Sequence, residues 1–176
     1  NRIITMGLDV QEPLLPRVDD APLPAKVFDH QTPFLHEEDK TKVLTLRTVR
    51  DRIFRSKVLK AYGSRCALTG FKFINGGGRA EVEAAHIKSV GAKGPDVVQN
   101  GLALSGTIHW MFDRGLLSVA DDRQILLSNH INDVDGVRKI LNENGLAVFP
   151  EHPSERPDPR YLQWHREQCF KGVALS

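Results

Sequence analysis

A strand pattern changes to a helix pattern within the stretch NGLALSGTIHWMFDRGLLS, residues 100–118. Its apolar run GLAL (101–104) predicts a short strand. Ser105 then stands at an N-cap position, and a short helix is expected from there to about Arg114, with Gly115 as its stop. A strand that leads directly into a helix indicates a fold of mixed class.

The expected helix has an apolar stripe and a polar row beside it. Ile108, Met111 and Phe112 recur at helical spacing, so they form the face that packs inward. His109 and Asp113 occupy the neighbouring row, and residues four apart on a helix have Cβ atoms about 5–6 Å apart. Both side chains can therefore reach one ion, although such a pair is more often a hydrogen-bonded pair on a helix surface.

Two further strands are expected upstream of this stretch. AEVEAAHI (80–87) predicts a strand of small and apolar residues that includes His86, and CALTGFKF (66–73) predicts a strand and turn. With NGGGR (75–79) as a flexible loop between them, the two runs are compatible with a hairpin. The glycines and proline of residues 88–99 indicate a loop between His86 and the strand 101–104.

A longer helix is expected from about Leu44 to Tyr62, where Gly63 supplies a stop. The apolar positions that recur at helical spacing are Val49, Ile53, Phe54, Val58, Leu59 and Tyr62.

This helix lies in a strongly basic segment. The whole chain has a net charge of only +2, but residues 40–65 hold nine basic residues against one acidic residue. Such a run is typical of a solvated helix face or of a phosphate-contacting surface, and composition alone does not separate the two.

The remaining segments complete one domain. LLSV (116–119) and QILLS (124–128) predict a hairpin, and short helices are expected within 133–145 and 160–170. Five of the ten prolines fall in residues 1–40, which predicts an extended arm or linker with one short strand near Val27 and Phe28. The expected organisation is an arm at 1–40 and a domain at 41–176, with its core at 64–130 and C-terminal helices at 131–176.

Composition excludes several classes of protein. A chain of 176 residues with 40% hydrophobic residues can bury one core. Charges interrupt every apolar run before the roughly 18 residues that a membrane span requires. The two cysteines form no CxxC pair, which argues against a zinc knuckle or a disulfide framework. A soluble, cytoplasmic protein is expected, and because no leader pattern follows Asn1 the chain is compatible with a fragment of something longer.

The order His86, Asn100, His109 resembles the HNH endonuclease family, the ββα-metal nucleases, and in particular its restriction-associated branch. The matching text is CALTG, EAAHI, NGLALSGTIHWMFDRGLLS and, more loosely, YLQWHREQCF. The resemblance covers about residues 44–130, and several separated motifs in one order make it specific. It implies an α+β fold with a small ββα-metal core, flanking helices and an extended N-terminal arm.

The resemblance also implies roles for individual residues. His86 would be the general base, Asn100 would hold the loop and the base, and His109 with Asp113 would hold a divalent metal ion (Mg, Mn, Ni or Zn). A neutral imidazole with a pKa near ~6.5 can take a proton from water at cellular pH. A divalent ion stabilises charge on the phosphate and on the departing 3′-oxygen, and cleavage would leave 5′-phosphate and 3′-hydroxyl ends.

The sequence departs from the family at one position. Many HNH nucleases carry an Asp or His immediately before the base, and this chain has Ala85 there. Glu83 is the nearest carboxylate on the strand and is a candidate ligand or water-holder, although strand alternation puts it on the face of Ala85, opposite His86. Asp96 in the loop is a weaker substitute, and water and phosphate can fill the remaining positions.

Basic residues near the motifs are candidate DNA contacts. Arg114 is also explained by its place at a helix C-terminus, where a cation is stabilised. The candidate DNA-binding residues are Arg47, Arg50, Arg52, Arg55, Lys57, Lys88, Lys93 and Arg114.

Other singled-out residues have structural explanations. Cys66 is expected to be a buried small residue. Three histidines lack a partner pattern typical of ligands, namely His130, His152 and His165, and a packed or partly exposed side chain is expected for His165.

The function that the sequence predicts is a metal-dependent DNA endonuclease of restriction type. One alternative is a degenerate HNH module that binds DNA without cutting it, motivated by Ala85. Another is a nonspecific nuclease toxin with an inhibitor partner. The expected partner is DNA rather than a membrane, and both a homodimer that cuts two strands and an upstream recognition domain in a longer protein are compatible with the chain.

Overall fold

The computed structural model describes the backbone of residues 37–175 and the side chains of residues 48–175. The first helix begins at Glu37, before the expected start near Leu44, and ends at Ala61. Most of the expected arm, including the strand near Val27 and Phe28, lies outside the described residues.

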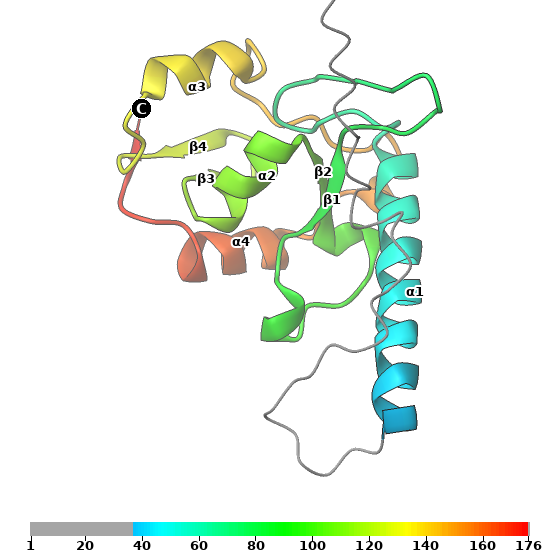
Figure 1. Cartoon of the computed structure of the whole chain (residues 1–176). Coiled ribbons are helices and arrows are strands. Elements are labelled where there is room, and N and C mark those ends of the chain that lie inside the picture. Colours follow the sequence, from blue (N-terminus) through cyan, green and yellow to red (C-terminus); the bar gives the residue numbers. More distant parts are fainter. Residues whose placement is uncertain (1–36, 176) are drawn as a thin grey trace, which may run out of the picture. The chain divides into compact units, whose positions relative to one another are not determined.

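The described part contains small antiparallel sheets and short helices, which confirms the α+β class (Figure 1). The elements in chain order are α1 (Glu37–Ala61), β1 (Glu83–His86), η1 (Val90–Ala92), η2 (Val98–Asn100), β2 (Gly101–Leu104), α2 (Gly106–Asp113), β3 (Leu117–Val119), β4 (Ile125–Ser128), α3 (Val134–Ile140), η3 (Pro153–Glu155), α4 (Pro159–Gln168) and β5 (Ala174–Leu175).

The β1 strand pairs with β2, not with residues 66–73. In the antiparallel register, Ala85 faces Leu102 and His86 faces Gly101. The expected pairing of β1 with 66–73 is therefore wrong, and only an isolated bridge joins Ile74 to Ala80. The physical reason is that the backbone at 66–71 folds back on itself in a turn, with Gly70 N donating to Cys66 O and Cys66 N donating to Phe71 O.

The α1 helix covers one face of the β1–β2 hairpin. Phe54, Val58 and Tyr62 are buried at successive i+4 positions, whereas Val49 and Ile53 are 46% and 49% exposed. The expected apolar stripe is therefore wrong at those two positions, because the buried row runs along one line of the helix and they lie beside it.

Gly101 allows α1 to approach β2 closely. A Cβ atom at this position would lie 2.5 Å from Val58 Cγ2 and 3.1 Å from Phe54 Cζ. A contact of 2.5 Å is far inside the normal separation of carbon atoms. The start of β2 therefore requires glycine where the helix crosses it.

The α2 helix forms as predicted but with a different N-terminal cap. Ile108, Met111 and Phe112 are buried, as expected. Ser105 has the extended backbone of an N-cap, but its side chain makes no capping hydrogen bond. The carboxylate of Glu81 instead accepts from Gly106 N at 2.8 Å, which satisfies one of the free N–H groups at the helix start.

The C-terminal part adds a second sheet and two short helices. β3 and β4 pair antiparallel as predicted, and β5, which no sequence pattern predicted, pairs with the end of β4. One apolar cluster runs from α1 through the hairpin and α2 to β3, β4 and α4, and it includes the buried Cys66. None of the described helices is long and apolar enough to cross a membrane.

Candidate active site

His86 lies at the end of β1, held between an aromatic ring and a carboxylate. Its side chain is 18% exposed. The ring stacks on Phe54 of α1, with a centroid separation of 3.9 Å and an interplanar angle of 11°. Its Nε2 atom lies 2.9 Å from Asp96 Oδ1. Both contacts restrain the plane of the imidazole.

Asp96 connects His86 to α1. Its second oxygen accepts from Arg50 Nε at 2.9 Å and from a terminal nitrogen of the same guanidinium. Burial acts to raise the pKa of Asp96, but the hydrogen bonds and positive charges of Arg50 and His86 outweigh it and hold the pKa below its ordinary value. Asp96 is therefore a carboxylate at neutral pH.

Asn100 fixes the loop that carries Asp96. The side chain is fully buried, its Oδ1 accepts from Lys88 N at 2.8 Å, and its Nδ2 donates to Lys88 O at 2.9 Å and to Pro95 O at 3.0 Å. Gly94 lets the loop close, because a Cβ there would lie 1.8 Å from Lys88 O. One side-chain amide thus holds both ends of this loop, the pinned loop, by hydrogen bonds to Lys88 and Pro95.

His109 on α2 lies between two carboxylates. Its Nδ1 is 2.8 Å from Glu83 Oε2, and its Nε2 is 3.5 Å from Asp113 Oδ2. The helix therefore brings His109 and Asp113 together as their spacing predicted, and Glu83 reaches the ring from β1.

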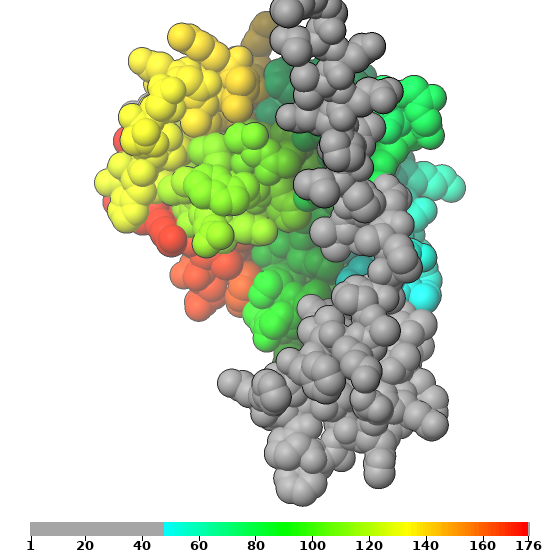
Figure 2. All heavy atoms as spheres, viewed as in Figure 1, coloured from blue at the N-terminus to red at the C-terminus, as the bar shows by residue number. Residues whose placement is uncertain are grey.

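These groups occupy opposite faces of the hairpin. Side chains alternate along a strand, so Glu83 and His86 point to opposite sides of β1. α2 lies on the Glu83 side, where His109 meets it, and α1 lies on the His86 side, where Phe54 stacks (Figure 1). α2 is exposed on the face that Figure 2 shows, between α3 and the C-terminal segment.

The donor set suits a particular kind of ion. In residues 48–175, no three His, Cys, Asp or Glu side chains are grouped as a metal site. Ala85, at the position where the resemblance implies a further ligand, is fully buried. His109 Nε2 and Asp113 are two donors, which fits an ion of the magnesium type that keeps several waters and not a closed four-ligand zinc site.

Besides Arg50, three of the predicted cationic residues have partners within the protein. Arg55 donates to Val82 O at 2.9 Å, the Lys88 ammonium lies 5.8 Å from the centroid of the Trp164 ring, and Arg114 lies 5.9 Å from that of Trp110.

The remaining predicted cations are either bound to a carboxylate, exposed, or outside the part of the chain whose side chains are described. Arg50 binds Asp96. The side chain of Arg47 lies outside the described residues. Arg52, Lys57 and Lys93 are exposed.

Sequence reasoning described Asp96 incompletely, whereas His165 is packed, as expected. Asp96 was considered only as a substitute ligand, and nothing local in the sequence indicates that it meets Arg50, which is 46 positions away. His165 is buried, with Nδ1 2.9 Å from Ser118 Oγ, Nε2 3.2 Å from Phe112 O, and its ring stacked on Phe112. Burial lowers the pKa of His165 to about 4, so this side chain packs as a neutral group.

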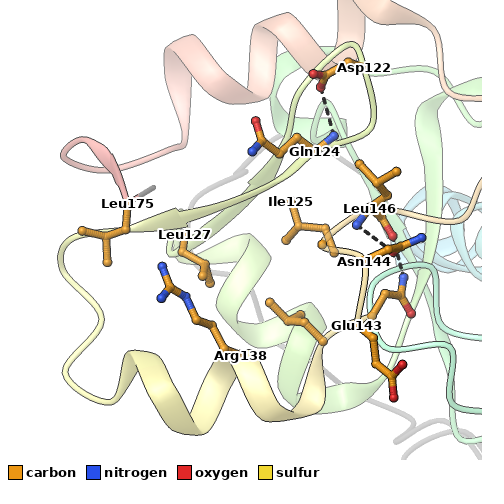
Figure 3. A pocket seen from close by; sticks show the side chains of 12 residues that line it. Asp122, Gln124, Ile125, Leu127, Arg138, Glu143, Asn144, Leu146 and Leu175 are labelled. Carbon is orange, nitrogen blue, oxygen red and sulfur yellow. Dashed lines mark hydrogen bonds between the residues drawn. The ribbon is translucent and has the colours of Figure 1, made fainter.

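A hollow elsewhere on the molecule holds none of the predicted site residues. It has a volume of about 560 Å³ and lies between β4, β5 and α3 (Figure 3). Leu127 and Ile125 project into it from β4, and Arg138 lies beside it on α3.

Comparison with known proteins agrees with this geometry. Residues 66–120 match the family model of HNH endonucleases. A solved structure described as the modification-dependent TagI restriction endonuclease is 27% identical, with a TM-score of 0.50, and the match covers 69% of this chain and 39% of that one. No curated protein matches the chain.

A β-hairpin, a pinned loop and a helix carry His86, Asn100 and His109 in order, and the segment 66–120, which holds all three, is similar to the HNH endonucleases. The likeness to a restriction endonuclease supports their restriction-associated branch. The predictions of an HNH-type segment and of the α+β fold are confirmed. The chain spans 39% of the length of the solved restriction enzyme.

Proposed function

We propose that this chain is a metal-dependent DNA endonuclease of restriction type, with His86 as its general base. The observation that carries the proposal is the placement of His86 at the end of the β1–β2 hairpin, where its ring stacks on Phe54 and its Nε2 contacts Asp96.

The reaction is the hydrolysis of a phosphodiester. His86 takes a proton from water, the water oxygen forms a bond to phosphorus, and the bond from phosphorus to the 3′-oxygen breaks as that oxygen takes a proton from solvent water. Asn100 keeps the loop closed while the base acts. His109 and Asp113 would hold a divalent ion, whose chemistry is to neutralise charge on the phosphate and the departing oxygen. The products would be 5′-phosphate and 3′-hydroxyl ends.

Glu83 has a supporting role in this proposal. Its carboxylate lies on Nδ1 of His109, which leaves Nε2 to face Asp113. Carboxylates bonded in this way orient a ligating histidine and raise its basicity. Glu83 is therefore proposed as a partner of the ligand His109 and not as a ligand itself.

The substrate is proposed to be double-stranded DNA bound along α1. Arg52 and Lys57 are exposed on this helix, and Lys93 is exposed on the loop that precedes Asp96. Phosphate contacts of this kind are independent of sequence. A target sequence or modification would then be read by a recognition domain in a longer protein, and a homodimer would cut both strands.

The second candidate is a DNA-binding module without cleavage activity, and Ala85 favours it. This side chain is fully buried, so nothing can replace the usual ligand at that position. The two candidates differ in their response to divalent ions, since only an enzyme shows ion-dependent cleavage.

The test is plasmid cleavage by the wild-type chain and His86→Ala, with EDTA, Mg²⁺, Mn²⁺ or Ni²⁺. Asp135→Asn, which changes an exposed residue of α3, serves as the matched control. We expect cutting that requires a divalent ion, persists in the control and is lost in His86→Ala. Cleavage by His86→Ala at the wild-type rate would show that the base is wrongly assigned, and retardation of DNA without cutting in any ion would favour the binding module.

A further inference from the structure

We infer that Arg50, Asp96 and His86 form a positioning relay, in which Asp96 selects the tautomer of His86 so that Nδ1 takes the proton from water. Arg50 belongs to this relay and is not a phosphate contact. The inference rests on the proposed function and adds two positioning residues to it.

The contact of Asp96 with His86 determines which ring nitrogen is free. A carboxylate can only accept a hydrogen bond, so the 2.9 Å contact from Asp96 Oδ1 requires a proton on Nε2 of His86. In a neutral imidazole the other nitrogen then carries the lone pair. Nδ1 is therefore the atom that can accept a proton.

The ring cannot easily turn to exchange its nitrogens. Phe54 stacks against its face at 3.9 Å, and Asp96 is held by two bonds from Arg50. The loop behind Asp96 is closed by Asn100, which bonds Pro95 O, the carbonyl directly before Asp96. Each part of the relay is thus anchored to α1 or to the pinned loop.

The relay also balances charge during the reaction. When water gives its proton to Nδ1, His86 becomes an imidazolium and its positive charge faces the Asp96 carboxylate. An adjacent carboxylate stabilises such an imidazolium. The proton then leaves Nδ1 for solvent after the bond to the 3′-oxygen has broken, which restores the neutral ring.

Arg50 is committed to this carboxylate. Both of its contacts, from Nε and from a terminal nitrogen, end on Asp96 Oδ2. These two contacts orient the guanidinium towards Asp96 and offset part of its charge, while the side chain stays 61% exposed. Loss of Arg50 should therefore change turnover more than DNA affinity.

The test uses the full chain and its Asp96→Asn, Asp96→Glu and Arg50→Gln variants. Two control variants change exposed residues of α3. Asp135→Asn is the same chemical change as Asp96→Asn, and Lys139→Gln removes one positive charge, as Arg50→Gln does. Thermal unfolding checks that each variant folds. The first readout is the tautomer of His86 in the metal-free protein, from the nitrogen chemical shifts of ¹⁵N-labelled histidine. The second is plasmid cleavage, and the third is DNA affinity as a function of salt.

We expect a proton on Nε2 of His86 in the wild type and a loss of that preference in Asp96→Asn, because an amide can donate as well as accept. Cleavage should fall about 100-fold in Asp96→Asn and recover in part in Asp96→Glu. Arg50→Gln should lower the cleavage rate with an unchanged salt dependence of DNA binding.

The inference is overturned by a wild-type proton on Nδ1, or by an Asp96→Asn variant that keeps the wild-type tautomer and rate. An Arg50→Gln variant that loses DNA affinity and salt dependence but cuts at the wild-type rate at saturation makes Arg50 a phosphate contact and removes it from the relay. If the wild type cuts no DNA in any ion, the proposed function fails, while the tautomer still tests the relay by itself.

Discussion

Glu83 Oε2 lies 2.8 Å from Nδ1 of His109, and Asp113 Oδ2 lies 3.5 Å from Nε2 of the same ring. The imidazole of His109 is therefore contacted by two carboxylates, one from β1 and one from α2. Glu83 on the strand orients the ring through Nδ1. Asp113 on the helix lies near Nε2, the nitrogen proposed to bind the ion. The two acids should therefore respond differently to substitution.

The first prediction concerns these two acids. Glu83→Gln should weaken binding of Mn²⁺ about 10- to 100-fold, as is typical for loss of a group that orients a ligand, and Asp113→Asn should weaken it more. Isothermal titration with Mn²⁺ measures both, with the exposed Glu143→Gln as control. A larger loss in Glu83→Gln than in Asp113→Asn would make Glu83 the ligand.

The second prediction concerns Asn100. Asn100→Ala removes three hydrogen bonds, to Lys88 N, Lys88 O and Pro95 O, from a part-buried loop. An unsatisfied buried group costs about 1–3 kcal/mol, and because these groups are only partly buried the free energy of unfolding should fall by about that amount in total. Urea denaturation measures the change. Asn100→Asp should also lose stability, because the oxygen that replaces Nδ2 would face the acceptor oxygens Lys88 O and Pro95 O. An Asn100→Asp variant as stable as the wild type would count against this account.

The third prediction concerns the contact of α1 with β2. A methyl group in Gly101→Ala meets Val58 Cγ2 at 2.5 Å, and overpacking typically costs about 1–3 kcal/mol. Gly77→Ala is the control, because a Cβ there meets only Asn75 Oδ1 at 3.5 Å. Adding Val58→Ala to Gly101→Ala should restore part of the lost stability in a double-mutant cycle. Simple additivity of the two changes would mean that the clash is relieved elsewhere.

The fourth prediction concerns pH. The pKa of His165 is about 4 in the folded protein against 6.5 for the free side chain, so the unfolded chain binds more protons between these values. The resulting contribution is present above pH 6.5 and is lost as the pH falls towards 4, by up to about 3 kcal/mol.

Urea denaturation at pH 7 and pH 4.5 tests the sign and the cause. The wild type should lose stability between these values, and His165→Gln should lose less. A variant with the same pH dependence as the wild type would assign the acid sensitivity to other groups.

Local patterns predicted most of the elements. The β2 strand, α2 and the β3–β4 hairpin follow from short apolar runs bounded by turn residues, and the packed face of α2 follows from its spacing. Such signals depend on neighbours in the chain, so a single sequence contains them. The spacing of His109 and Asp113 likewise placed both side chains together.

Contacts between distant segments could not be predicted. Residues 66–73 and 101–104 are both apolar enough to pair with β1, and only the turn at Gly70 excludes the first. Arg50 and Asp96 are 46 positions apart, and the sequence around each residue does not indicate that the two form an ion pair. Likewise, periodicity correctly placed Val49 and Ile53 on a helix, but it did not predict that they lie on the exposed side of that helix.

The pinned amide of Asn100 has a consequence for the chemical ageing of the protein. Asparagine followed by glycine is the pair most prone to deamidation, in which the nitrogen of the next residue attacks the side-chain carbonyl. Here Gly101 N donates to Val98 O, and the Asn100 side chain is held on three sides. The fold thus shields this Asn-Gly pair, so deamidation at Asn100 would record the time that a molecule has spent unfolded.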